Sequence, residues 1–199
     1  MQNRIIAGIL MLAVTASLLL SALLARRVTQ LEKIMEPLKA QLAMESRQKA
    51  GREKFMQRYA QDRQKYTPEQ LSDAENLMRI GDQKWGSPEA IEACQTMVKK
   101  YPGSDRAGCA MLYLADMSKG DERAKYLQDC IDQYNDCFYG DGVQVGVYAR
   151  FLLAEDYQSN GEAEKAKALF SEIKTQYADA IDHTGKLLVD SIKAGSKLR

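Results

Sequence analysis

Residues 147–179 read VYARFLLAEDYQSNGEAEKAKALFSEIKTQYAD, and this stretch decides the fold. Leu153, Ala154 and Tyr157 share one face at helical spacing in its first half. A second apolar stripe follows in its second half, formed by Ala166, Phe170, Ile173 and Tyr177. Gly161 separates the two stripes, as is typical of a turn between helices. The stretch therefore predicts a helical hairpin and an all-α fold class.

This order of residues resembles the tetratricopeptide repeat. The family places a large and then a small residue before an aromatic one in its first helix, as Leu153, Ala154 and Tyr157 do here. A small residue and an aromatic one follow in its second helix, as do Ala166 and Phe170. The resemblance covers the stretch almost end to end, although Ala178 stands where the family prefers proline. It implies a scaffold of stacked helix pairs that binds protein or peptide partners.

Two further units precede this one. Thr67-Pro68 and Ser87-Pro88 are helix-start signals, and they predict a first hairpin with helices at 71–84 and 88–101. In the middle unit, residues 110–115 correspond to 149–154, and Leu127, Cys130 and Tyr134 correspond to Phe170, Ile173 and Tyr177. An insertion around residues 137–142 separates the last two units, and residues 182–197 predict a capping helix. Residues 67–199 are thus expected to form an α-solenoid of about three hairpins plus a C-terminal cap.

Residues 5–25 contain no charged side chain and number 21. At 1.5 Å per residue this length spans a hydrocarbon core of about 30 Å. A cleaved signal peptide is the alternative, but a cut after Ala25 would leave Leu23 where a small residue is required. The sequence predicts a transmembrane anchor at residues 1–25, in a single-pass membrane protein.

Residues 26–66 predict a basic helical stalk. An alternating spacing of three and four residues joins Val28, Leu31, Met35, Leu38 and Leu42, as in a short coiled coil. That spacing favours homo-oligomerisation through the stalk, whereas a solvated single helix is the alternative. Pro37 is expected to kink or locally break the helix because it lacks an amide donor.

The charge is divided between the two ends of the chain. Residues 1–66 carry 12 Lys and Arg against 5 Asp and Glu, whereas residues 67–199 carry 16 against 22. The acidic part argues against nucleic-acid binding, which requires a clustered basic face. The basic residues beyond the anchor favour a cytoplasmic repeat domain by the positive-inside rule.

The four cysteines favour the opposite orientation. Their even number in the repeat domain suits an oxidising compartment, with Cys130–Cys137 and then Cys94–Cys109 as predicted disulfides. The alternative is that they are small buried side chains. Resemblance to anchored repeat proteins of the bacterial cell envelope also implies an inner-membrane protein with a periplasmic repeat domain. A cytoplasm-facing adaptor stays open as the alternative.

No motif for catalysis or cofactor binding stands out. His183 is the one histidine in the chain, which excludes a metal site built from several histidines of one chain. No set of nucleophile, base and orienting group is recognisable. The sequence therefore predicts a non-enzymatic protein with neither cofactor nor metal.

The resemblance implies a binding groove along the first helix of each hairpin. Aligning the units on Met78, Ala115 and Ala154 assigns nine positions to this predicted groove: Glu75, Arg79, Asp82, Leu112, Asp116, Tyr148, Phe151, Glu155 and Gln158. Aromatic residues at one end and carboxylates along it predict a partner peptide of basic character. The alternative is that these are ordinary packing and surface positions, in which case the loop at Phe138 and Tyr139 is the next candidate.

Overall fold

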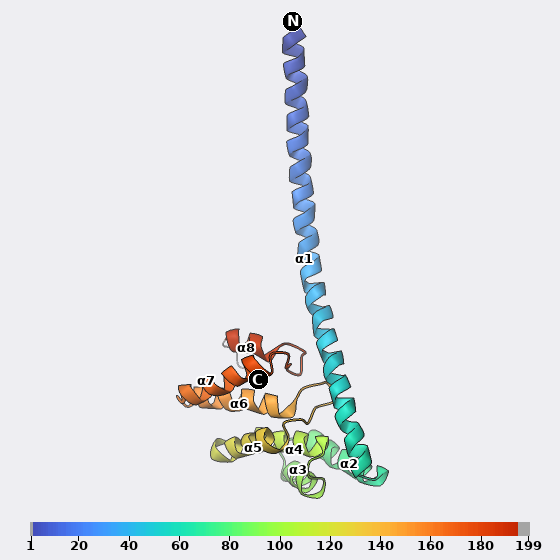
Figure 1. The fold of residues 1–199 in the computed structure, drawn as a ribbon, viewed down its shortest axis with the longest axis vertical. Coiled ribbons are helices and arrows are strands. Elements are labelled where there is room, and N and C mark those ends of the chain that lie inside the picture. Colours follow the sequence, from blue (N-terminus) through green and yellow to red (C-terminus); the bar gives the residue numbers. More distant parts are fainter. Residues whose placement is uncertain (1, 195–199) are drawn as a thin grey trace. The chain divides into compact units, whose positions relative to one another are not determined.

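The chain is all-α in the computed structural model, which describes the backbone of residues 2–194 and the side chains of residues 11 and 17–193 (Figure 1). Eight helices make up this part of the chain, without a named β-strand. They are α1 (Gln2–Lys65), α2 (Pro68–Gln83), α3 (Pro88–Lys100), α4 (Asp105–Met117), α5 (Gly120–Gln133), α6 (Val145–Ser159), α7 (Ala163–Gln176) and α8 (Leu188–Ala194).

Two compact units divide the chain, Met1–Ala43 (unit 1) and Met44–Arg199 (unit 2). Helix α1 belongs to both, and the predicted stalk at residues 26–66 likewise spans both. The break predicted at Pro37 is wrong, because α1 continues through it as one helix of 64 residues. A proline removes one main-chain hydrogen bond, and here the helical bonds on either side are sufficient.

Large apolar side chains lie exposed along α1 in unit 1. They include the predicted seam residues Val28, Leu31, Met35, Leu38 and Leu42, each about half exposed or more. Among the residues that the structure describes, no helix offers an apolar run long enough to cross a membrane. The predicted anchor lies largely outside the described side chains, which omit residues 1–10 and 12–16.

Helix pairs α2/α3, α4/α5 and α6/α7 form three hairpins, and each helix from α2 to α8 also packs on the next. Both predicted start signals are confirmed. The Thr67 hydroxyl accepts a hydrogen bond from Gln70 N, and the Gln70 side chain accepts one from Thr67 N, in a capping box. The Ser87 hydroxyl accepts a bond from Ala90 N at 3.2 Å. Local capping therefore sets where α2 and α3 begin.

A tyrosine ends the second helix of every hairpin. Tyr101, Tyr134 and Tyr177 are the C-cap residues of α3, α5 and α7, with similar backbone angles. Each donates its amide to a carbonyl four residues earlier, in Met97, Cys130 and Ile173 respectively. The predicted correspondence of Tyr134 with Tyr177 is confirmed, and Tyr101 occupies the same position in the first hairpin.

Two loops of the same form follow the second and third hairpins. We call residues 135–144 the first bridge loop and residues 178–187 the second bridge loop. Each is closed by one antiparallel bridge, Phe138 with Gln144 and Ile181 with Leu187, and the two loops lie 43 positions apart. A helix begins directly after each bridge, α6 at Val145 and α8 at Leu188.

The capping helix predicted at residues 182–197 therefore begins later than expected. Within the second bridge loop, the Asp182 carboxylate accepts hydrogen bonds from the amides of Thr184 and Lys186 at 2.8 and 3.0 Å. Such side-chain bonds compete with helix formation. Gly185 then adopts a φ of 83°, outside the helical region. The described part of this helix is Leu188–Ala194, and residues 195–199 lie outside the description.

The core of unit 2 includes all four cysteines. The structure holds Cys94, Cys109, Cys130 and Cys137 as buried free thiols and does not contain the predicted disulfides. Burial raises the pKa of every one of these thiols, that of Cys94 to about 11. They pack as small apolar side chains between helices, which is how free cysteine usually behaves.

The last turns of α1 lie against the turns that end the three hairpins. Asp62 accepts a hydrogen bond from Asp105 N at 2.8 Å, and Arg58 donates one to Gly103 O, in the turn between α3 and α4. Gly51 contacts Gly142 of the first bridge loop closely, and Arg47 donates to Gly185 O of the second at 3.3 Å. One face of residues 44–65 thus holds all three hairpin ends.

Candidate functional site

Two residues of the predicted groove are core residues. Leu112 and Phe151 are each about 1% exposed, so neither presents its side chain freely to a partner. Helices α4 and α6 are buried on most sides, with nine buried residues each. An apolar stripe cannot show which face of such a helix is open, and this is why the assignment of Leu112 to an exposed groove is wrong, whereas buried Phe151 still borders an open space between α6 and α7.

Most of the charged groove residues pair with neighbouring helices. Glu75 on α2 accepts a bond from Arg106 on α4 at 2.6 Å. Asp82 accepts one from the Tyr113 hydroxyl. Arg123 on α5 bridges Asp116 and Asp156 at 2.8 and 2.7 Å, whereas Arg79 bonds within α2 to Gln83. These groups link adjacent helices of the described chain, so a basic peptide would have to compete with existing partners.

The bridge loops cover the position of Tyr148. His183 of the second bridge loop lies edge-on to the Tyr148 ring at 5.2 Å and to the Tyr139 ring at 4.9 Å. His183 Nδ1 also lies 2.7 Å from a carboxylate oxygen of Asp141. Phe138 is 9% exposed, and burial raises the pKa of Tyr139. The alternative site at Phe138 and Tyr139 is therefore largely covered by the chain itself.

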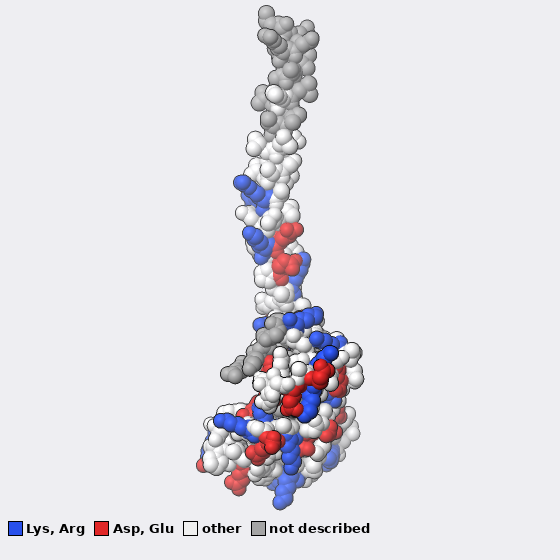
Figure 2. Space-filling model, turned by 90° about the vertical axis from the view of Figure 1, so that its left-hand side faces the viewer, with Lys and Arg blue, Asp and Glu red and all other residues white. Residues whose placement is uncertain are grey.

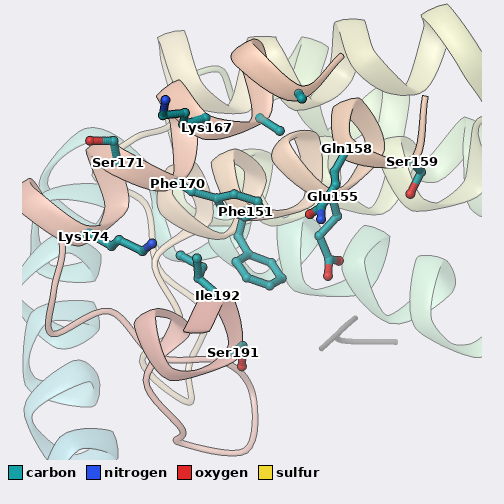
Figure 3. Close-up of a pocket in the computed structure, with 12 residues that line it drawn as sticks. Phe151, Glu155, Gln158, Ser159, Lys167, Phe170, Ser171, Lys174, Ser191 and Ile192 are labelled. Atoms are coloured by element: carbon teal, nitrogen blue, oxygen red, sulfur yellow. The ribbon is translucent and has the colours of Figure 1, made fainter. Parts of the chain in front are cut away.

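A cavity of about 730 Å³ opens between α6, α7 and α8 (Figure 3). It contains three of the nine predicted groove residues, Phe151, Glu155 and Gln158 from α6. Sequence reasoning missed the rest of its lining: Ser159, Ala163, Ala166, Lys167, Phe170, Ser171, Lys174, Ser191 and Ile192. Phe170 belongs to the apolar stripe predicted for the second helix of the hairpin, and it is half-buried and lines this space.

The cavity has an apolar floor and a charged rim. The rings of Phe151 and Phe170 lie 5.9 Å apart, with Ala166 and Ile192 beside them. Lys167 and Lys174 stand exposed on the α7 side, and Glu155 and Gln158 stand on the α6 side. A concave apolar surface with a few polar groups at its edge is suited to binding an apolar ligand face.

Both signs of charge are mixed on the face of unit 2 that Figure 2 presents. Figure 2 shows Lys and Arg side chains interspersed with Asp and Glu on the face that it presents. Among the described residues, no group of three or more His, Cys, Asp or Glu is placed to hold a metal ion. The cavity is therefore the feature of unit 2 with the clearest capacity for binding.

Comparison with family models, with characterised proteins and with solved structures finds no match to this chain.

Proposed function

We propose that this protein is a membrane-anchored scaffold whose helical repeat domain binds a protein or peptide partner. In this proposal, the hairpins of unit 2 form a solenoid of the tetratricopeptide type, and the anchor at residues 1–25 tethers it to the bacterial inner membrane. The domain faces the periplasm and takes part in assembling a cell-envelope complex without catalysing a reaction. Three successive hairpins with corresponding tyrosine caps support the repeat architecture.

The cavity between α6, α7 and α8 is the observation that carries the binding role. Its volume of about 730 Å³ lies within the usual range of binding sites, about 300–1,000 Å³. Phe170 and Ile192 remain half-buried and line the same concavity, and apolar side chains gathered in this way are typical of an interaction site. A partner that places an apolar face on them would complete their burial.

Photocrosslinking in membranes tests this role. A photoreactive residue is introduced at Ser171, on the exposed rim of the cavity, and at Thr96 on α3 as the matched control. We expect a protein crosslinked from Ser171 but not from Thr96, and lost when Phe170→Glu is added. Circular dichroism checks that the variant keeps its helices. The same crosslinked protein in the Phe170→Glu variant would show that the cavity is not the binding site.

A second candidate is a stalk that oligomerises. The seam residues Val28, Leu31, Met35, Leu38 and Leu42 are exposed along α1 in unit 1. Burial of this stripe against a second copy of α1 would remove apolar surface from water. Cysteine crosslinking of Leu31→Cys in membranes tests the idea, and exclusively monomeric protein after oxidation would reject it.

A further inference from the structure

The third hairpin differs from the second in what covers it. Helices α5 (Gly120–Gln133) and α7 (Ala163–Gln176) have the same length of 14 residues and end at corresponding tyrosines. Helix α6, of 15 residues, packs on α5, and it starts at the place where α8 starts after α7. The described part of α8 has seven residues. Within the part of the chain that the structure describes, the cavity is therefore where α7 lacks the cover that α6 gives to α5.

Side chains at corresponding positions of α5 and α7 differ in how deeply they are buried. Leu127 on α5 is completely buried, whereas its counterpart Phe170 on α7 is half-buried and lines the cavity. Ridges of one helix normally pack into grooves of another at such a face. The geometry thus fits a further helix lying on α7, in the way that α6 lies on α5.

The face of α7 that lines the cavity carries positive charge, whereas the corresponding face of α5 is apolar. Ala124 and Ile131 on α5 correspond to Lys167 and Lys174 on α7. Both lysines are exposed and line the cavity, and neither forms an ion pair with a described residue. Seven residues separate them, which is about 10.5 Å along a helix. A helix on α7 would therefore lie beside two positive charges about two turns apart.

We propose that the cavity binds an amphipathic helix of a partner protein that carries carboxylates along the flank facing Lys167 and Lys174. This inference rests on the proposed function and specifies the partner. Apolar side chains of such a helix cover Phe170 and Ile192, in the manner of helix-in-groove recognition. Its carboxylates, about two turns apart, pair with the two lysines, which adds specificity to the apolar contact.

The chain's own segments match this description poorly. The only Asp and Glu residues of α6, Glu155 and Asp156, are neighbours near its C-terminal end, so a further helix of that kind would not place carboxylates two turns apart beside both lysines. Residues 195–199, which lie outside the described part, carry Lys197 and Arg199 and no acidic side chain. Their charge has the same sign as that of the α7 flank. Charge complementarity therefore favours an acidic helix from another protein.

Two labelled peptides test the proposal by fluorescence anisotropy. Both are 14-residue amphipathic helices with the same leucine face, and one carries glutamates at i and i+7 where the other carries lysines. The full-length chain is used in nanodiscs of neutral lipid, with empty nanodiscs subtracted. We expect the glutamate peptide to bind at least tenfold more tightly than the lysine peptide.

Charge reversal supplies the decisive variant. Lys167→Glu with Lys174→Glu should reverse the preference, so that the lysine peptide binds more tightly. Lys99→Glu with Lys125→Glu makes the same change in net charge at exposed positions outside the cavity, and should alter neither affinity by more than about twofold. All four positions are exposed, so these variants are expected to fold. Phe170→Glu should abolish the binding of both peptides.

Three results would overturn the proposal: equal binding of the two peptides, an equal effect of the control pair, or tighter binding of both peptides by tenfold once residues 195–199 are removed. The last result would identify those residues as the occupant. If the crosslink from Ser171 still depends on Phe170 in any of these cases, the binding role of the cavity stands and the acidic helix is wrong. If the crosslink is independent of Phe170, the proposed function is wrong as well.

Discussion

The first and second bridge loops share a backbone but differ in what holds them against α1. Corresponding main-chain bonds close both, from Tyr139 N to Val143 O at 2.8 Å and from Asp182 N to Lys186 O at 2.9 Å. Gly142 of the first loop meets the backbone of α1 at Gly51, whereas Gly185 of the second meets the flexible side chain of Gln48. The difference indicates that equal main-chain geometry gives unequal contributions to stability, because a backbone cannot move aside as a side chain can.

The two loops also differ in their polar anchors. In the first, buried Asp105 accepts a bond from Phe138 N at 2.9 Å, and Asp105 N in turn donates to Asp62. In the second, the ion pair of Lys54 with Asp179 leaves the two side chains 51% and 76% exposed. Exposed pairs contribute little, whereas a buried carboxylate affects stability strongly through its ionisation. Four substitutions test this contrast.

Gly142→Ala should have the largest effect. Its φ is 96°, and an added Cβ would lie 2.6 Å from Gly51 Cα. Left-handed strain of about 1–2 kcal/mol and overpacking of about 1–3 kcal/mol together predict a loss of about 3 kcal/mol in the free energy of unfolding. Urea denaturation of the full-length chain, followed by circular dichroism, measures it. Gly140→Ala is the matched control, since its added Cβ meets nothing within 4 Å.

Asp105→Asn should change the pH dependence of stability. Burial raises the pKa of Asp105 to about 7, despite the opposing effects of the Phe138 amide and of Arg58. The folded state therefore binds a proton that the unfolded state releases between about pH 4 and 7, so the contribution of Asp105 to stability falls as the pH rises through this window. We expect the wild type to lose about 2 kcal/mol relative to Asp105→Asn between pH 5 and 8.

The measurement is urea denaturation of both proteins at pH 5, 6, 7 and 8. Using the difference between the two proteins removes the contribution of the other carboxylates. Asparagine keeps an oxygen for the Phe138 amide, so the variant is expected to fold. Parallel pH profiles would show that Asp105 does not titrate in this range.

Gly185→Ala should have a smaller effect than Gly142→Ala. Its φ of 83° is also left-handed, but the nearest atom to an added Cβ is Gln48 Cγ at 2.9 Å. Because that side chain can rotate away, the backbone strain of about 1–2 kcal/mol should dominate. Adding Gln48→Ala should recover little of this loss in urea denaturation. Recovery of most of it would mean that side-chain crowding, rather than backbone strain, limits the second loop.

Asp179→Asn should have the smallest effect, below about 0.5 kcal/mol, because its partner Lys54 is also exposed. Thermal melting at low and high salt should then give nearly the same difference between variant and wild type. A loss above about 1 kcal/mol in the free energy of unfolding would mean that this exposed pair stabilises the second loop substantially. The contrast between the two loops would then be wrong.

Local signals predicted the helices well where they were strong. Thr67 and Ser87 combine a hydroxyl cap with a following proline, and α2 and α3 begin where these signals indicate. The second bridge loop had a weaker signal, since Asp182 and Gly185 break the helix through a turn without proline. Comparison with residues 134–145 at an interval of 43 could have revealed it.

The cavity and the packed face of α1 were harder to predict. Phe170 fits an apolar stripe whether or not a further helix covers it, so the stripe alone cannot identify an open surface. The buried face of α1 includes Gly51, Arg58 and Asp62. These residues give no apolar periodicity, because the face is held by close backbone contact and ion pairs. Only the assembled hairpins show which α1 positions have partners.

The contacts of α1 also impose a constraint on chain length. Arg47, Gly51, Arg58 and Asp62 lie on one helical face because their separations of four, seven and four residues are close to whole turns. Insertion or deletion of one residue between them would turn part of the face by about 100° and shift it by 1.5 Å. Even a seven-residue insertion, which restores the direction, would displace Gly51 from Gly142 by about 10.5 Å if Asp62 kept its place. Length changes before Met44 would leave these contacts in register, so relatives of this chain are expected to vary in length there and to keep residues 47–62 free of gaps.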